Sequence, residues 1–239
     1  MTPRVTERRL VSVIVPVFRN ETTLAELHRR IAQALESAAV AREIIFVDDG
    51  SDDHSVEEIH VLMNRHADVR LLALPANGGQ QQAVLAGMRV AQGDLIATID
   101  ADLQDPPEAL GALVSRMDDP SVDAVFATRR GAYESAARLR TSRVFKRVVR
   151  ALTGMPSGAG MYLVMKRETM QAILDAPLTL FYLPTALMRV TRRVAAVPVE
   201  RASRAGGVSQ YTSSGRTRLA LTALAGALWW RFRRPRRAP

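Results

Sequence analysis

Short apolar runs alternate with amphipathic segments through the first 128 residues. Runs rich in β-branched residues predict five strands, at Leu10–Val17, Glu43–Val47, Val69–Leu74, Leu95–Asp100 and Asp123–Thr128. Between them, apolar residues recur every three or four positions and predict helices from Thr22 or Thr23 to about Ala39, over Ser55–His66, over Gln80–Ala91 and after Pro106. This alternation indicates an α/β fold with a mainly parallel sheet flanked by helices.

The second half of the chain has a less regular pattern. It predicts a long basic helix over Ser135–Leu152, a breaker-rich loop over Gly154–Gly160 and a strand over Met161–Met165. A short helix over Glu168–Leu174, a final strand over Val194–Val199 and a polar loop over Ala202–Gly215 are predicted to follow. Residues 1–9 are charged and lack an apolar core, so we expect a disordered N-terminus and no signal peptide. Residues 10–215 are expected to form one domain.

Residues 216–239 form a basic tail around an apolar segment, Leu219–Trp230. A helix of this length spans about 18 Å, which is short of the ~30 Å hydrocarbon core of a bilayer. Paired Trp residues and flanking Arg residues are typical of the membrane interface. The tail is therefore expected to form an amphipathic, membrane-associating helix, with packing on the domain or on a partner as the alternative.

Charge is distributed unevenly along the 239 residues. Residues 1–128 hold 11 Arg against 20 Asp and Glu, a net charge of −9, whereas residues 129–239 carry +18. An acidic half suits a metal site and a basic half suits an anionic partner. The chain has no Cys, and its His residues show no metal-ligand grouping in the sequence, at positions 28, 54, 60 and 66. The pI near 11.0 alone is weak evidence for nucleic-acid binding, and no nucleic-acid module is recognisable.

Two carboxylates follow the fourth predicted strand, in the segment Asp100-Ala101-Asp102-Leu103-Gln104. Side chains at i and i+2 of an extended chain point to the same side. Open α/β sheets bind ligands beyond the carboxyl ends of their strands. Hard oxygen ligands suit Mg²⁺ or Mn²⁺, so this segment predicts a metal site, although a solvated turn has the same pattern.

A second acidic cluster, Asp48-Asp49-Gly50-Ser51, follows the second strand. It is interpreted either as a turn with helix caps or as a contact to a base or ribose. Phe18 follows the first strand on the same edge, as core or as a base-stacking residue. Asn77-Gly78-Gly79 lacks the Lys of a P-loop, and no GxGxxG follows the first strand, which argues against ATPases and dehydrogenases.

Three motifs in this order carry a family resemblance: Val15–Glu21, Val47–Ser51 and Asp100–Glu108. Together they resemble the family 2 glycosyltransferases of GT-A fold. The similarity is greatest to the polyprenyl-phosphate sugar transferases, a group that includes dolichyl-phosphate mannose synthase, and it covers about residues 10–215.

The resemblance implies a role for each matching position. Nucleotide-sugar binding is implied for Pro16, Phe18, Glu21, Val47, Asp49, Asp100, Ala101, Asp102, Gln104, Arg129, Arg204 and Gln210. The implied metal ligands are Asp100, Asp102 and Gln104, and the implied catalytic residues are Asp100, Asp102 and Arg129. The implied ligands of the acceptor phosphate are Arg129, Arg138 and Ser142.

The sequence departs from the family pattern at two places. Gln210 stands where the loop over the diphosphate usually carries Lys, and Met161 and Leu163 stand where many relatives carry Asp and Arg. A phosphate acceptor tolerates the loss of an acidic base, because its second pKa near 6 leaves it largely a dianion at pH 7. It needs positioning by Arg more than deprotonation.

The resemblance therefore implies an inverting glycosyltransferase that depends on Mg²⁺ or Mn²⁺. It would move a sugar from a nucleoside-diphosphate donor to a polyprenyl phosphate at the cytoplasmic face of the cell membrane. Residues 216–239 would hold the protein on the membrane surface, where a membrane-protein subunit is a candidate partner, and no nucleic acid would be bound. The alternatives are a hydroxyl acceptor on a soluble metabolite or glycan, and a degenerate, non-catalytic binding module.

Overall fold

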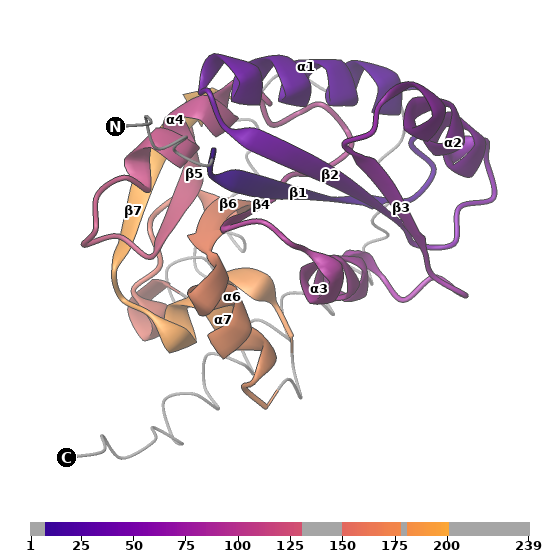
Figure 1. Ribbon diagram of the computed structural model, residues 1–239. Helices are drawn as coiled ribbons and strands as arrows, with labels where there is room; N and C mark the ends of the chain where they lie inside the picture. The colour runs from indigo at the N-terminus through magenta and orange to yellow at the C-terminus, as the bar shows by residue number, and fades with distance from the viewer. Residues whose placement is uncertain (1–7, 131–149, 178–180, 201–239) are drawn as a thin grey trace.

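The protein folds around one seven-stranded sheet, whose order is β3-β2-β1-β4-β6-β5-β7. The computed structural model describes residues 8–130, 150–177 and 181–200 (Figure 1). The strands are β1 Leu10–Val17, β2 Ala41–Asp48, β3 Val69–Ala73, β4 Leu95–Thr98, β5 Ala124–Arg130, β6 Ala159–Lys166 and β7 Val194–Glu200. Helices cover both faces of this sheet, as buried parallel strands require.

Two groups of helices enclose the sheet. They are α1 Leu24–Ser37, α2 Ser55–Arg65 and α4 Ala109–Arg116 on one face, and α3 Gln80–Val90, α6 Arg167–Leu174 and α7 Leu183–Val190 on the other (Figure 1). The predicted strands and helices of the described residues are confirmed, with boundaries shifted by a few residues. Helix α7, which has Pro184 in its first turn, was not predicted from the sequence.

The order of the strands differs from a simple parallel succession. Strands β1, β2, β3 and β4 are paired in parallel, but β4 does not pair with β5. Strand β6 lies between them and is antiparallel to both. The pattern of apolar residues predicts the type of each element but not which strands are neighbours. The position of β6 between β4 and β5 could therefore not be predicted from the sequence.

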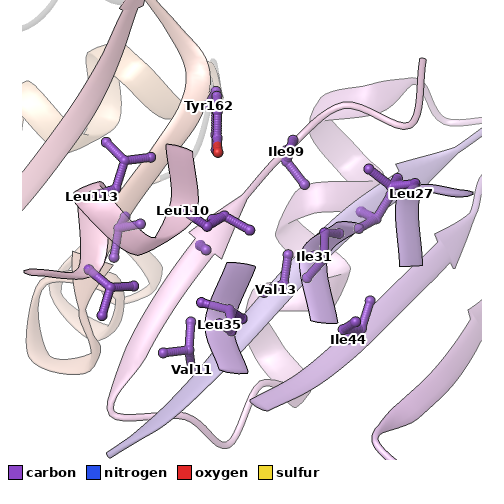
Figure 2. Close-up of a cluster of buried hydrophobic side chains, with 14 of the residues drawn as sticks. Val11, Val13, Leu27, Ile31, Leu35, Ile44, Ile99, Leu110, Leu113 and Tyr162 are labelled. Atoms are coloured by element: carbon purple, nitrogen blue, oxygen red, sulfur yellow. The ribbon is translucent and has the colours of Figure 1, made fainter. Parts of the chain in front are cut away.

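The core on the α1 face explains why helix and sheet pack where they do. Leu27, Ile31 and Leu35 of α1 belong to one core cluster with Val11 and Val13 of β1, and Ile31 lies beside Val13 and Leu35 beside Val11 (Figure 2). All five side chains are fully buried. Burial of one such side chain contributes about 1.5–3 kcal/mol, so this stripe fixes α1 firmly over the sheet.

On the opposite face, one glycine allows α3 to approach the sheet closely. A Cβ atom at Gly87 would lie 2.5 Å from Cγ2 of Ile14 and 3.1 Å from Cγ2 of Val47. Any larger residue would push α3 away from β1 and β2. The close packing brings Gln80, the first residue of α3, to the edge where the strands end.

Several predictions fall outside the described residues. They concern most of the N-terminal segment 1–9, most of the helix Ser135–Leu152, the loop Ala202–Gly215 and the tail 216–239. The division into N-terminus, domain and tail therefore stays a prediction. Among the residues that the structure describes, no helix is both long enough and apolar enough to cross a membrane.

Candidate active site

The segment after β4 brings two carboxylates to the carboxyl edge of the sheet. Ile99 continues the path of β4, and its N–H donates to the carbonyl of Ile14 at 3.2 Å. Asp100 and Asp102 follow and are both partly exposed, whereas Ala101 between them is buried. Both carboxylates therefore lie beyond the carboxyl end of β4, where they were predicted.

The chain around these carboxylates is held in place by neighbouring loops. Thr23 is the N-cap residue of α1, but its side chain makes no cap hydrogen bond. Its hydroxyl donates instead to the carbonyl of Ala101 at 2.7 Å. Leu103 adopts a positive φ of 57°, which turns the chain sharply after Asp102. The acidic segment is thus tied to the start of α1.

Amide groups orient both carboxylates. The backbone N–H of Gln104 donates to Oδ1 of Asp102 at 3.2 Å. The Gln104 side chain is largely buried, with the residue 8% exposed. Nε2 of Gln80 donates to Oδ1 of Asp100 at 2.5 Å. Gln80 was not predicted as a site residue; its position at the start of a helix on the same edge was the available signal.

Arg129 of β5 lies beside the acidic segment. Its guanidinium binds the carboxylate of Asp105 with two hydrogen bonds, of 3.1 and 2.7 Å, and its NH2 lies 4.0 Å from Oδ2 of Asp100. Asp105 is almost fully buried, while the Arg129 side chain keeps 33% of its surface exposed. A cation and three carboxylates, those of Asp100, Asp102 and Asp105, therefore share one site.

The charge of Arg129 is secured by these neighbours. Burial acts to lower the pKa of Arg129. The hydrogen bond and negative charge of Asp105, together with the charges of Asp100 and Asp102, outweigh burial and hold the pKa above its usual value. The guanidinium is therefore charged at any working pH and is available to bind a phosphate.

The breaker-rich segment before β6 packs against Arg129. Gly158 has φ +79°, and its carbonyl accepts the backbone N–H of Arg129 at 3.2 Å. A Cβ at position 158 would lie 2.9 Å from the carbonyl oxygen of Arg129, and one at Gly160 would lie 3.8 Å from its guanidinium carbon. Gly158 therefore allows a close approach to the backbone of Arg129, whereas a Cβ at position 160 would make only an ordinary van der Waals contact.

The two aspartates of the Asp48–Ser51 cluster accept hydrogen bonds from different turns. The carboxylate of Asp48 accepts the backbone N–H groups of Gly50 and Ser51, which is the turn interpretation. The carboxylate of Asp49 accepts those of Gly78 and Gly79, each at 2.8 Å. Burial raises the pKa of Asp49, while these two hydrogen bonds act to lower it. Asp49 thus anchors the Gly-rich turn to the end of β2.

The loop after β1 forms the rest of the edge. The Arg19 guanidinium lies 5.0 Å from the centre of the Phe18 ring and is bound by both oxygens of Asp52. Oε2 of Glu21 accepts the backbone N–H of His54 at 2.9 Å. Phe18 is half-buried, in the position expected of a residue at the edge of the sheet.

Two other residues implied in donor binding differ in their exposure. Val47 is fully buried against α3, which leaves its side chain no surface at the site. Pro16 is partly exposed at the end of β1. The side chain of Pro16 therefore remains accessible at this edge, and that of Val47 does not.

Tyr182, which the sequence analysis missed, lies close enough to the site to be affected by its charges. Burial raises the pKa of Tyr182, Arg129 acts to lower it and Asp100 acts to raise it. The next residue is fixed by α3, because the N–H of Leu183 donates to Oε1 of Gln81 at 3.0 Å. A lone Tyr before an unpredicted helix gave no signal in the sequence.

The two departures in β6 are buried and apolar. Met161 is 7% exposed and Leu163 is fully buried. Sδ of Met161 accepts a hydrogen bond from Nε2 of Gln81 at 3.2 Å. These positions belong to the core between the sheet and α7, where an unpaired charge would be costly. The remaining implied ligands, Arg138, Ser142, Arg204 and Gln210, lie outside the described residues.

The mainly parallel sheet with helices on both faces and an acidic segment beyond β4 is a fold of the GT-A type. Solved structures agree with this class. Glucosyl-3-phosphoglycerate synthase from Mycobacterium tuberculosis, in complex with Mn²⁺, UDP and its product, matches with a TM-score of 0.68 over 93% of this chain and 80% of that one, at 19% identity. The same enzyme with Mg²⁺ and UDP matches with a TM-score of 0.70 over 93% and 79%, at 18% identity.

Residues 12–190 match the model of the family described as Glycosyl transferase family 2, and the chain belongs to this family. Curated relatives include the undecaprenyl-phosphate 4-deoxy-4-formamido-L-arabinose transferases of Salmonella choleraesuis (strain SC-B67) and Salmonella paratyphi B (strain ATCC BAA-1250 / SPB7). Each is 36% identical over 208 residues, which cover 84% of this chain. The chain spans 62% of the length of these relatives.

Proposed function

We propose that the chain is an inverting, metal-dependent glycosyltransferase that moves a sugar from a nucleoside diphosphate to a polyprenyl phosphate. The observation that carries this proposal is the position of Arg129, bound to the buried Asp105 and 4.0 Å from Asp100. It places a permanent cation beside carboxylates that suit a metal-bound diphosphate. The names of the undecaprenyl-phosphate relatives support the choice of acceptor.

The residues at the end of β4 fit a hard divalent cation. Asp100 and Asp102 offer carboxylate oxygens from a partly exposed edge, and Gln104 is the proposed third ligand. Such oxygens suit Mg²⁺ or Mn²⁺. When bound, the metal would neutralise the diphosphate that leaves with the nucleotide. Gln80 and the backbone of Gln104 would keep the two carboxylates oriented toward it.

Arg129 is proposed to hold phosphate oxygens of the donor and of the acceptor. One acceptor oxygen forms a bond to the anomeric carbon while the bond from that carbon to the diphosphate breaks, and the electron pair leaves with the nucleotide. The configuration at the anomeric carbon is inverted by this single displacement. A phosphate dianion needs no base, so the buried Met161 is compatible with the reaction.

The loops after β1 and β2 are proposed to receive the nucleotide. Phe18 would stack the base, with Pro16 and Glu21 beside it, while Asp49 holds the Gly-rich turn in place. Val47 would contribute only through its backbone, since its side chain is buried. The hydrogen bond from the backbone N–H of His54 to Glu21 keeps these two loops together, which would preorganise the donor site.

Residues outside the described part complete the proposal. Arg138 and Ser142 are proposed ligands of the acceptor phosphate, and Arg204 and Gln210 are proposed ligands of the donor diphosphate. Residues 216–239 are proposed to hold the protein peripherally at the cytoplasmic face of the membrane, where a polyprenyl phosphate is found. A membrane-protein subunit is a further possible partner of this tail.

The test is a panel of nucleoside-diphosphate sugars with Mn²⁺ or Mg²⁺, with and without a short polyprenyl phosphate. We expect one donor to release its nucleoside diphosphate only when lipid phosphate is present, and Asp102→Asn to lower the rate at least about 100-fold. Asp118→Asn is the matched control, because Asp118 pairs with Arg9 on the surface. Turnover with a water-soluble hydroxyl acceptor and no response to lipid phosphate would contradict the proposed acceptor.

A further inference from the structure

A second group of metal-ligating side chains lies away from the active site. His28 of α1, His66 at the end of α2 and Asp68 before β3 each offer a ligand atom, and these atoms lie within 4.8 Å of one another. No metal-ligand grouping of the histidines was expected from the sequence, but the structure brings two of them together with Asp68. His28 and His66 are 38 residues apart in the sequence, and only the packing of α1 against α2 unites them.

His28 is the unusual member of this group. It lies on the buried side of α1 beside Leu27 and is 3% exposed. Its Nε2 is buried and has no hydrogen-bond partner. The nearest carboxylate oxygen, Oδ1 of Asp68, is 3.8 Å away, which is too far for a hydrogen bond. An unpaired polar atom in such a position lowers the stability of the fold by about 1–3 kcal/mol, and a ligand bound to this atom would remove that cost.

The other two side chains face the same point from a rigid backbone. The His66 ring lies 4.2 Å from the His28 ring, centre to centre, at an angle of 38°. The N–H of His66 donates to the carbonyl of Leu62 at 2.9 Å, and the carbonyl of Asp68 accepts the N–H of Ile44 at 2.7 Å. The backbone at both positions is therefore fixed, and only side-chain rotation is needed to bring the ligand atoms together.

We propose that His28, His66 and Asp68 bind a divalent transition-metal ion, of which Zn²⁺ is the best match. Two imidazole nitrogens and one carboxylate oxygen are a donor set that favours Zn²⁺, Co²⁺ or Ni²⁺ over Mg²⁺. Ligand bonds of about 2.0–2.2 Å require donor atoms about 3.3 Å apart in a tetrahedral site. The present separations, up to 4.8 Å, would close to that value by rotation of the His66 and Asp68 side chains, which are both partly exposed.

Arg42 completes the surroundings of this site. Its Nε donates to Oδ2 of Asp68 at 2.6 Å, which leaves Oδ1 on the side of His28. Ligating carboxylates are commonly oriented by such an outer hydrogen bond. The His66 and Asp68 side chains are partly exposed, so the ion enters from their side and water fills the remaining coordination position.

The location indicates a structural ion rather than a catalytic one. Asp68 directly precedes β3, so the group lies at the amino ends of the parallel strands, whereas Asp100 and Arg129 lie at the carboxyl ends. The ion would join α1, the end of α2 and the start of β3. This inference does not depend on the proposed glycosyl transfer.

The test uses the full chain freed of metal with EDTA and then titrated with Co²⁺, whose visible absorption reports nitrogen ligands. We expect one equivalent to bind with such a band, and His66→Ala to weaken its binding by more than the ~10–100-fold cost of an outer-layer substitution. His60→Ala is the matched control, because His60 is an exposed histidine of α2. Asp102→Asn removes the other candidate metal site and should leave the band unchanged.

Thermal unfolding with Zn²⁺ gives a second readout. At 100 times the dissociation constant, Zn²⁺ should raise the melting temperature of the wild type by roughly 5–10 °C, and should not raise that of His66→Ala. His66 is half-buried, so this variant should fold. The inference is overturned if His66→Ala binds Co²⁺ as tightly as the wild type, if the band disappears in Asp102→Asn instead, or if Zn²⁺ leaves the wild-type melting temperature unchanged.

Discussion

Asp105→Asn tests the ion pair that positions Arg129. The two residues share hydrogen bonds of 3.1 and 2.7 Å, and Asp105 is almost fully buried. Asn keeps one acceptor oxygen and replaces the other with an NH₂ group, so one charge-assisted bond is lost. Such bonds contribute about 1.5–3 kcal/mol. Because a third of the Arg129 side chain is exposed and regains water, we expect the lower end, about 1.5 kcal/mol.

For a chain of this length, that loss lowers the melting temperature by about 3–6 °C. We also expect kcat/KM for the donor to fall about 10-fold or more, since a loosened guanidinium no longer meets the phosphates in one geometry. Calorimetry and nucleoside-diphosphate release measure the two effects. Asp118→Asn, on the exposed pair with Arg9, should change neither. If Asp105→Asn behaves like Asp118→Asn in both assays, Asp105 does not position Arg129.

Three further predictions follow from local geometry. Gly158→Ala should destabilise the fold by at least about 1 kcal/mol, because φ is +79° and the new Cβ would lie 2.9 Å from a backbone oxygen. Gly111→Ala in α4 should be neutral or stabilising, and chemical denaturation compares the free energies of unfolding of the two variants. Gln80→Ala should weaken Mn²⁺-dependent donor binding about 10-fold by releasing Asp100, measured by calorimetry; unchanged binding contradicts that role. Burial raises the pKa of Tyr162 well above 10.0, so above pH ~10 the unfolded chain loses this proton and the fold keeps it. Stability should then fall by up to ~1.4 kcal/mol per pH unit in the wild type and less steeply in Tyr162→Phe, and equal slopes would refute the assignment.

The sequence was sufficient for elements that carry a strong local period. The strand Leu10–Val17 was predicted with the bounds that the structure has, and Asp100 and Asp102 were placed correctly at the carboxyl edge. Both predictions rest on local physics, in which an apolar run forms a buried strand and parallel strands end on the same edge. The family motifs lie in the same regular part of the chain.

Contacts between distant segments could not be predicted from local pattern. The pair Asp105–Arg129 and the bond from Gln80 to Asp100 depend on which strands and helices are neighbours. Strand β6 lies next to β4 in the sheet, and the periodicity of apolar residues does not predict this pairing. For the same reason the proximity of His28 and His66 could not be predicted, because their side chains come together only when α1 and α2 pack on one face.

The central claim is that the carboxylates beyond β4 hold a metal-bound nucleotide. Calorimetric titration of UDP, GDP, CDP and ADP, each with and without Mn²⁺, tests it most directly. We predict that at least one nucleotide binds the wild type only with Mn²⁺, and that Asp102→Asn weakens this binding at least about 10-fold while Asp118→Asn does not. Nucleotide binding that is equally tight without metal and in Asp102→Asn would contradict the claim.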